Sequence, residues 1–165
     1  MDIDNFKAVN DLQGHKAGDD LLHLIAVTMK KNLRTMDTVA RLGGDEFAVF
    51  MPETKLEQTR IVIDRLQKTL LEVAKNNQWP ITFSAGVVCY DTPPQTAGEA
   101  IKAADELMYS AKTSGKNKIL YEQRSGRRTP DKRNFILKRR NQNFRGANFF
   151  QFSQRLGGSA PNLPV

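Results

Sequence analysis

The sequence contains a single cysteine, Cys89, so no disulfide can form within the chain. Cys89 lies in an apolar run typical of a strand, and we expect a buried structural thiol in a reducing compartment. No apolar run approaches the roughly 20 residues that a membrane-spanning helix needs. Acidic residues follow Met1, rather than a basic and then apolar stretch, so we expect no signal peptide and a cytoplasmic location. Tethering to a membrane through further upstream sequence stays open.

Acidic residues are scarce after residue 122. Residues 123–165 contain ten Lys or Arg and one acid, Asp131, whereas residues 1–122 contain 15 basic and 17 acidic residues. The net charge of +7 is therefore a property of the tail. We divide the chain into a domain at 1–122 and a basic tail at 123–165, whose composition favours disorder. The other interpretation is attraction of the tail to nucleic acid or anionic lipid. We favour disorder and expect no nucleic-acid partner.

Apolar residues recur at helical spacing in three stretches and cluster as in strands elsewhere. We expect helices at residues 19–35, 54–73 and 97–113. Thr54, with Glu57 three residues later, matches a capping box. We expect strands at residues 39–42, 47–51, 81–90 and 118–121. A hydrophobic content of 39% is enough for the core of one ordinary domain.

A glycine pair separates the two strands expected at 39–42 and 47–51, which predicts a tight hairpin. Gly43 and Gly44 are followed directly by Asp45 and Glu46. Glycines at an exposed tip leave room for a bulky ligand, because they have no Cβ. Two carboxylates at that tip suit Mg²⁺ and the phosphates that accompany it. The alternative is an ordinary acidic turn.

Further motifs accompany the hairpin. The chain opens with DIDNFKAVND at residues 2–11, followed by GHKAGD at 14–19. Downstream lie TFSAGV at 82–87, ADELMYSAK at 104–112 and GKN at 115–117. With GGDEF at 43–47, this series resembles the GGDEF family of diguanylate cyclases, in the family's own order, from Asp2 to about Tyr121. Several separated motifs in order are more specific than one alone. Members of that family condense two GTP molecules into cyclic di-GMP.

The resemblance implies an α+β fold with a GGDEF or palm-like antiparallel sheet flanked by helices. The family places its first strand centrally, beside the second strand of the hairpin. Only residues 1–3 remain of that strand here, so we expect the first central strand to be largely missing. Its loss would leave unpaired backbone donors and acceptors within the sheet. We therefore interpret residues 1–122 as an N-terminally truncated GGDEF domain whose upstream sensory or dimerisation module is missing.

Phosphodiester formation needs a deprotonated 3′-hydroxyl, an electrophilic α-phosphate and neutralisation of the departing pyrophosphate. By resemblance the cofactor is Mg²⁺, and its expected ligands are Asp2, the Ile3 carbonyl, Asp45 and Glu46. Glu46 also resembles the family's candidate acceptor of the 3′-hydroxyl proton. Lys7 resembles the lysine that offsets charge in the transition state. For Asp2 and Asp4 the alternative is a solvated loop start.

The expected substrate-binding residues also follow from the resemblance. A carboxylate at Asp19 can accept from the N1–H and amine of guanine, and the Asn10 amide can both donate and accept. Asp19 therefore favours GTP. His15 either contacts the substrate or packs the loop, and Asp4 is expected to be structural because we interpret strand alternation as directing it away from Asp2. Phe6 and Lys7 are expected on a loop that wraps the phosphates. The complete expected set is Phe6, Lys7, Asn10, His15, Asp19, Gly43, Gly44, Lys112 and Lys116.

Basic residues near the end of the third helix resemble those that the family places on the triphosphate. Lys112 and Lys116 occupy the two positions, and the family usually has Arg at the second. Lys116 keeps the charge but loses the bidentate fork of a guanidinium. The alternative for both is a solvated helix end, where the macrodipole favours cations. Arg34 and Asp37 match the family's RxxD site, so we expect inhibition by bound cyclic di-GMP.

The sequence thus predicts an enzyme, a Mg²⁺-dependent diguanylate cyclase that acts as a homodimer with one GTP in each subunit. Two other interpretations stay open. The chain could bind cyclic di-GMP through Arg34 and Asp37 without turnover, or it could be an inactive fragment that lacks its first strand. A weaker third interpretation is a nucleic-acid-binding protein that depends on the basic tail.

Overall fold

The structure of the protein is a computed structural model, and it describes residues 1–125. The predicted tail at 123–165 lies outside the described residues, except for its first three. Within the described part, no helix is long and apolar enough to cross a membrane. The elements in chain order are β1 (Asp2–Asp4), α1 (Phe6–Gln13), α2 (His15–Asn32), β2 (Thr38–Gly43), β3 (Glu46–Phe50), α3 (Leu56–Asn76), β4 (Thr82–Tyr90), α4 (Ala97–Thr113) and β5 (Ile119–Arg124).

The five strands form one sheet in the order β2-β3-β1-β4-β5. β1 lies at its centre and pairs antiparallel with both β3 and β4, as predicted for the first strand of the family's domain. Only three residues form β1. β2 and β3 form the predicted antiparallel hairpin. The α+β fold class is thereby confirmed.

One pairing departs from the expected antiparallel pattern. β5 runs parallel to β4, with Ala85 opposite Ile119 and Tyr90 opposite Arg124. The connection between them is the crossover helix α4, which returns the chain to the end of the sheet where β4 began. β5 also continues to Arg124, two residues beyond the boundary proposed at 122.

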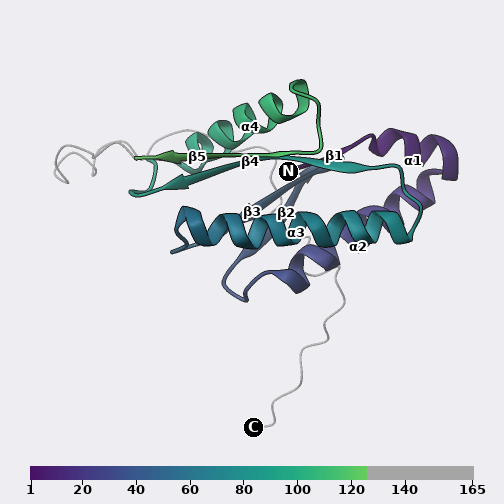
Figure 1. The fold of residues 1–165 in the computed structure, drawn as a ribbon, viewed down its shortest axis with the longest axis horizontal. Coiled ribbons are helices and arrows are strands. Elements are labelled where there is room, and N and C mark those ends of the chain that lie inside the picture. Colours follow the sequence, from purple (N-terminus) through teal and green to yellow (C-terminus); the bar gives the residue numbers. More distant parts are fainter. Residues whose placement is uncertain (126–165) are drawn as a thin grey trace, which may run out of the picture.

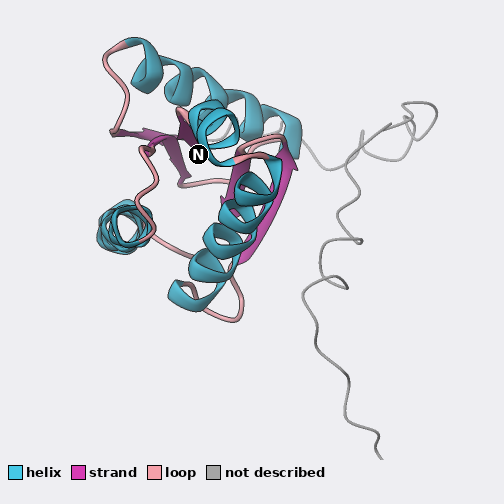
Figure 2. Cartoon of the chain, turned by 90° about the vertical axis from the view of Figure 1, so that its right-hand side faces the viewer, coloured by secondary structure: helices cyan, strands magenta, loops and turns pink. Residues whose placement is uncertain are grey.

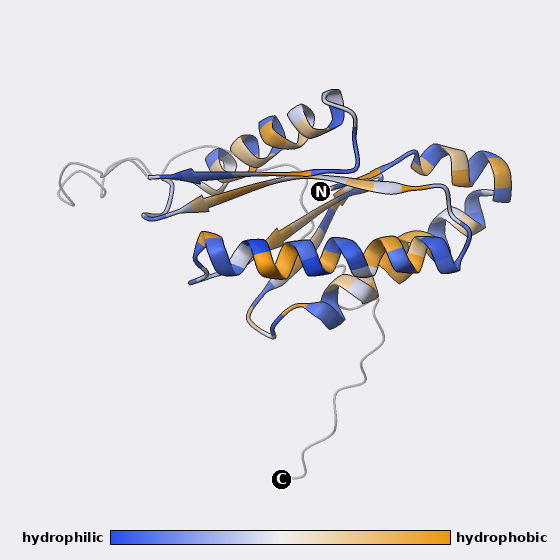
Figure 3. Ribbon diagram, viewed as in Figure 1, coloured by the Kyte–Doolittle hydropathy of each residue, from blue (hydrophilic) through white to orange (hydrophobic). Residues whose placement is uncertain are grey.

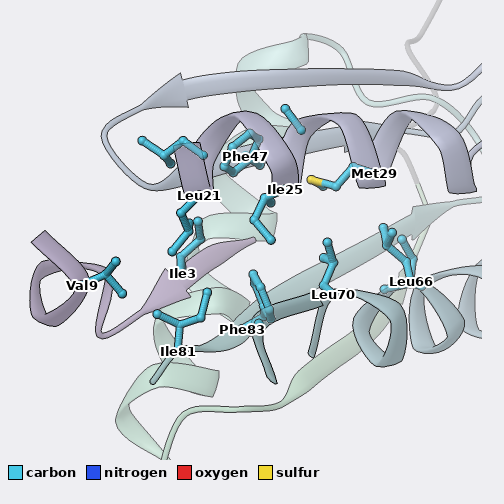
Figure 4. Close-up of a cluster of buried hydrophobic side chains, with 14 residues drawn as sticks. Ile3, Val9, Leu21, Ile25, Met29, Phe47, Leu66, Leu70, Ile81 and Phe83 are labelled. Atoms are coloured by element: carbon cyan, nitrogen blue, oxygen red, sulfur yellow. The ribbon is translucent and has the colours of Figure 1, made fainter. Parts of the chain in front are cut away.

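Helices cover both faces of the sheet (Figures 1 and 2). α4 lies on one face, α2 and α3 lie on the other, and α1 lies at one end. Apolar and polar residues alternate along α2, α3 and α4 (Figure 3). Each of these three helices buries a set of apolar side chains on one face, such as Ile25, Leu66 and Met108. The main core fills the space between the sheet and the α2–α3 layer (Figure 4). Its fully buried large side chains include Ile3, Leu21, Ile25, Met29, Phe47, Leu66, Leu70 and Phe83.

Three local predictions were wrong. The segment at residues 6–13 is a helix, α1, rather than a loop around the phosphates, so Phe6 and Lys7 belong to its first turn. α2 begins at His15 and ends at Asn32, because Leu33 adopts an extended backbone conformation. α3 begins at Leu56, and its N-cap residue Lys55 makes no side-chain capping bond.

Thr54 therefore does not form a capping box. Its hydroxyl donates instead to the carbonyl of Pro52, at 2.9 Å. The predicted burial of Cys89 is confirmed: its side chain extends from β4 toward α3, where the thiol lies 3.6 Å from the Thr59 hydroxyl.

Candidate active site

The pairing of β1 with β3 brings the two acidic motifs together. Asp2 and Glu46 are direct partners across the two strands. The amide of Phe47 donates to the carbonyl of Met1 at 2.8 Å, and the amide of Ile3 donates to the carbonyl of Asp45 at 3.3 Å. The two motifs therefore lie side by side where β1 and β3 begin, as the expected antiparallel pairing requires.

The hairpin tip beside these residues is open. An added Cβ would meet no atom within 4 Å at either Gly43 or Gly44. Gly43 lies in β2, so the turn itself consists of Gly44 and Asp45 rather than of the two glycines. Gly44 has φ of +49°, a conformation that favours glycine. The Arg41 side chain donates to the Gly44 carbonyl at 2.8 Å and fixes the turn.

Lys112 reaches this acidic cluster from α4. Its ammonium lies 2.6 Å from Oδ2 of Asp2, whose side chain is 6% exposed. Burial lowers the pKa of Lys112, but the hydrogen bond to Asp2 and the charges of Asp45 and Glu46 act more strongly together and raise it above its ordinary value. Burial raises the pKa of Asp2, and the bond from Lys112 opposes that shift. The ammonium is therefore the counter-ion of the three acids in this structure.

The sequence assigned Asp2 and Lys112 separately, to a metal and to phosphate, and did not predict that they pair. The two residues come from opposite ends of the domain, and no spacing pattern relates them. Only the position of α4 against the central strands makes the contact.

The acidic cluster has the chemistry of a Mg²⁺ site but not a preformed cage. Within residues 1–125, no group of three or more His, Cys, Asp or Glu side chains is arranged to hold a metal ion. Asp2, Asp45 and Glu46 nevertheless offer carboxylate oxygens, which a hard divalent cation prefers. All three act on the one ammonium of Lys112. The donor set therefore fits such a cation, provided that Lys112 moves away from Asp2.

The α1–α2 hairpin carries the expected base-binding residues. Asn10 is half-buried on α1, while Asp19 and His15 are exposed on α2. Gly18, which the sequence analysis did not single out, is buried at the crossing of the two helices. A Cβ at Gly18 would lie 2.0 Å from Oδ1 of Asn10. The absence of a side chain at Gly18 therefore leaves the space that the Asn10 amide occupies.

The Asp4 carboxylate is buried and directed into the domain. The prediction that strand alternation directs Asp4 away from Asp2 was wrong, because residues two apart in a strand lie on the same face. The Asp4 carboxylate accepts hydrogen bonds from the hydroxyls of Thr82 and Ser84 and from the amide of Asn117.

Lys116 directly precedes Asn117, whose amide donates to Asp4, and the Lys116 ammonium donates to Oδ1 of Asn5 at 3.0 Å. The structure thus places Lys116 against the start of α1 and Lys112 against β1. The two lysines do not share one contact.

Arg34 and Asp37 form a compact turn between α2 and β2. Oδ2 of Asp37 accepts from the amide of Arg34 at 2.9 Å, and the amide of Asp37 donates to the Arg34 carbonyl at 3.0 Å. The other oxygen of Asp37, Oδ1, is buried and has no hydrogen-bond partner among the described residues. The Arg34 side chain is exposed.

Comparisons with known proteins agree with these motifs. The family model "Diguanylate cyclase, GGDEF domain" matches residues 1–118. Diguanylate cyclase DgcP of Pseudomonas aeruginosa is 40% identical over 123 residues, which cover 72% of this chain and 18% of that protein. The chain spans only 11% to 36% of the length of the curated relatives that it matches.

The solved structures that are similar to the fold include two complexes. One is diguanylate cyclase SiaD from Pseudomonas aeruginosa, solved in complex with its activator SiaC. It is 32% identical with a TM-score of 0.65, and the match covers 73% of this chain and 47% of that one. The other is the GGDEF domain of DgcB from Caulobacter crescentus, solved in complex with c-di-GMP. It is 26% identical with a TM-score of 0.60, and the match covers 73% of each chain.

Proposed function

Because the chain belongs to the GGDEF family of diguanylate cyclase domains, we propose that it condenses two GTP molecules into cyclic di-GMP and two pyrophosphates. The observation that carries the proposal is the pairing of Asp2 with Glu46 across the central strands, with Asp45 in the adjoining turn. The open space at Gly43 and Gly44 gives a triphosphate access to these acids.

Each condensation joins the 3′-oxygen of one GTP to the α-phosphorus of the other. The 3′-hydroxyl loses its proton, and the bond from the α-phosphorus to the pyrophosphate oxygen breaks. Bound Mg²⁺, held by Asp2, the Ile3 carbonyl, Asp45 and Glu46, would supply the positive charge that this chemistry needs. Glu46 is the proposed proton acceptor.

Basic and amide side chains complete the proposed site. Lys7, in the first turn of α1, offsets the charge that builds on the phosphates. Lys112 and Lys116 bind the triphosphate, and Lys112 must then exchange its Asp2 contact for phosphate. Asn10 and Asp19 bind the guanine base. Phe6, His15 and the two glycines of the hairpin complete the substrate contacts.

Two subunits must face one another. Each subunit would hold one GTP, and the 3′-oxygen of each GTP would attack the α-phosphorus of the GTP in the other subunit. The chain spans only a small part of its curated relatives, so we propose that a sensory or dimerisation module elsewhere in the longer protein brings two such domains together. We propose that the domain spans residues 1–124, two residues beyond the boundary at 122 expected from the sequence, because β5 continues to Arg124.

The test is product formation from GTP and Mg²⁺, measured by chromatography on the purified protein. The chain is compared alone and fused to a dimeric coiled coil, which supplies the proposed dimer. Asp45→Ala should abolish turnover, while Asp91→Ala, which removes an exposed acid distant in sequence from the motif, should not. Equal product from wild type and Asp45→Ala would contradict the proposal.

The contact between Lys112 and Asp2 favours a second candidate, a receptor that binds cyclic di-GMP without turnover. In that case the acids stay neutralised by Lys112 and never receive a metal. Such a protein would bind cyclic di-GMP, make none from GTP, and show no change of Lys112 environment when Mg²⁺ and a GTP analogue are added.

We further propose that cyclic di-GMP inhibits the enzyme through Arg34 and Asp37. The exposed Arg34 guanidinium suits a phosphate. Oδ1 of Asp37 has no hydrogen-bond partner among the described residues but is buried, so it would accept from a donor on guanine only after the Arg34–Asp37 turn moves. Arg34→Ala should raise the concentration of added cyclic di-GMP needed for half inhibition. An unchanged value would refute this assignment without affecting the proposed synthesis.

A further inference from the structure

Asp4 lies at the centre of a hydrogen-bonded cluster that joins three segments of the chain. The residue is 3% exposed. The Thr82 hydroxyl donates to Oδ2 at 2.8 Å, and the Ser84 hydroxyl donates to Oδ1 at 2.9 Å. The backbone amide of Asn117 donates to Oδ2 at 3.1 Å. Asp4 therefore ties β1 to β4 and also to the turn between α4 and β5.

The backbone of that turn adopts an unusual conformation. Lys116 and Asn117 have φ of +59° and +48°, a left-handed region that residues with side chains rarely adopt. Two successive residues there persist only when surrounding contacts hold them. The contacts are the amide bond from Asn117 to Asp4 and a bond of 3.1 Å from the Lys116 amide to the carbonyl of Ala111.

The turn directs the Lys116 ammonium onto the start of α1. It lies 3.0 Å from Oδ1 of Asn5, the N-cap residue of that helix. Asn5 also has a positive φ, of 62°, and directly follows Asp4 in the chain. Asp4 thus holds both segments that meet at the Lys116–Asn5 contact, one through its own backbone and one through Asn117.

We propose that Asp4 is a positioning residue for GTP binding, which fixes the α4–β5 turn so that Lys116 is held ready for the triphosphate. The inference rests on the proposed function, in which Lys116 contacts the triphosphate. A lysine has no rigid fork with which to orient itself. Its backbone must therefore supply the orientation, and a preorganised turn reduces the entropy lost on binding.

Two substitutions at Asp4 separate this role from the charge of the carboxylate. Asp4→Ala leaves the Asn117 amide and two hydroxyls without their acceptor. Asp4→Asn keeps an oxygen for the Asn117 amide and the Thr82 hydroxyl, which share Oδ2, and the Ser84 hydroxyl, which faces the other position, can rotate to accept from the NH₂ group. If Asp4 acts by holding the turn, Asn should restore what Ala removes.

The experiment measures the dissociation constant of a non-reacting GTP analogue by calorimetry, with KM and kcat for GTP where turnover occurs. The full chain is used with Asp4→Ala, Asp4→Asn, Lys116→Ala and the double variants. Asp4→Ala should weaken binding by about 5- to 10-fold, less than the loss of a whole charge-assisted phosphate contact because the Lys116 ammonium is still present, and it should raise KM more than it lowers kcat. Asp4→Asn should stay within about twofold of wild type. Asp64→Ala is the matched control: it removes a carboxylate on α3 that accepts from the Tyr121 hydroxyl of β5, and it should change neither constant.

The decisive comparison is the Lys116→Ala background. There, Asp4→Ala should cause no further loss of GTP affinity, because its effect passes through Lys116. Independent, multiplying losses would overturn the proposal, as would an Asn variant as weak as the Ala variant. If Asp4→Ala does not fold, Asp4→Ser, which is too short to reach Asn117, takes its place in the same cycle.

The binding data also separate this proposal from the proposed function. A wild-type protein that binds the analogue but makes no cyclic di-GMP would refute the synthesis and leave the Asp4 cycle decisive. A wild-type protein that binds no GTP analogue at all would overturn both.

Discussion

Replacement of Gly18 by alanine should weaken GTP binding and also destabilise the domain, both through displacement of the Asn10 amide. The new Cβ would lie 2.0 Å from Oδ1 of Asn10 and 3.2 Å from the ring of Phe6. Ordinary contact begins at 3.4 Å, so the amide oxygen must retreat by about 1.4 Å. The neighbour is the end of a side chain, which can rotate, rather than fixed backbone.

Two effects on stability oppose one another in Gly18→Ala. Overpacking of this kind costs about 1–3 kcal/mol. Alanine in a helix interior is about 0.5–1 kcal/mol more favourable than glycine, and Gly18 lies within α2. The net loss of unfolding free energy should therefore be about 0–2.5 kcal/mol. If Asn10 binds the base, displacing its amide removes a hydrogen bond worth about 1–1.5 kcal/mol, or about 5- to 10-fold in GTP affinity.

Urea unfolding and calorimetry with a GTP analogue should be compared for wild type, Gly18→Ala, Asn10→Ala and the double variant. In the Asn10→Ala background the amide is gone, so Gly18→Ala should become neutral or stabilising and should not weaken GTP binding further. If Gly18→Ala costs as much stability and affinity in that background as in wild type, the steric argument is refuted.

Other substitutions test single contacts. Gly86→Ala should cost about 3 kcal/mol or more of unfolding free energy, since its Cβ would lie 2.2 Å from a backbone oxygen of α4. A loss of about 0.5 kcal/mol or less, as for a typical surface substitution, would contradict this. Thr96→Ala removes the acceptor that caps α4 and should cost about 1 kcal/mol of unfolding free energy, measured in urea. Thr54→Ala, at a residue with no capping role, should cost less than half as much. Equal losses would contradict the capping roles described for these two threonines. Burial and the hydrogen bond to Asp64 raise the pKa of Tyr121, so this tyrosine stabilises the fold fully below the unfolded tyrosine pKa of about 10 and loses that contribution as pH rises further. Tyr121→Phe should therefore show a smaller loss of stability between pH 9 and 11 than wild type, and parallel curves would refute the assignment.

Motifs in the sequence predicted much of the fold and the membership of the acidic cluster. The hairpin, the central place of β1 and the α4 helix follow from local patterns and from their collinear resemblance to one family. The same patterns could not reveal α1, because its mixed residues lack a long apolar stripe and include those assigned to phosphate binding. Thr54 was misjudged because a capping box also requires the following backbone to enter the helix at once, and here it does so only at Leu56.

Contacts between distant elements were beyond the sequence. Asp2 and Lys112 meet only because α4 packs over the central strands, and the Asp4 cluster forms only because β4 supplies two hydroxyls at the right register. Gly18 gave no signal other than its place one residue before Asp19. Side-chain pairing across a sheet depends on register and helix placement, which a single sequence leaves undetermined.

The central position of β1, the shortest strand, also affects the order in which the sheet can form during synthesis of the chain. Asp4 and its partner Ser84 are 80 residues apart, yet they lie side by side in the middle of the sheet. At a synthesis rate of about 5–20 residues per second, β1 leaves the ribosome roughly 4–16 seconds before β4. Until then β1 can pair only with β3, on one side. Its other edge, which β4 later covers, stays unpaired on the nascent chain and needs a chaperone or rapid completion of the sheet.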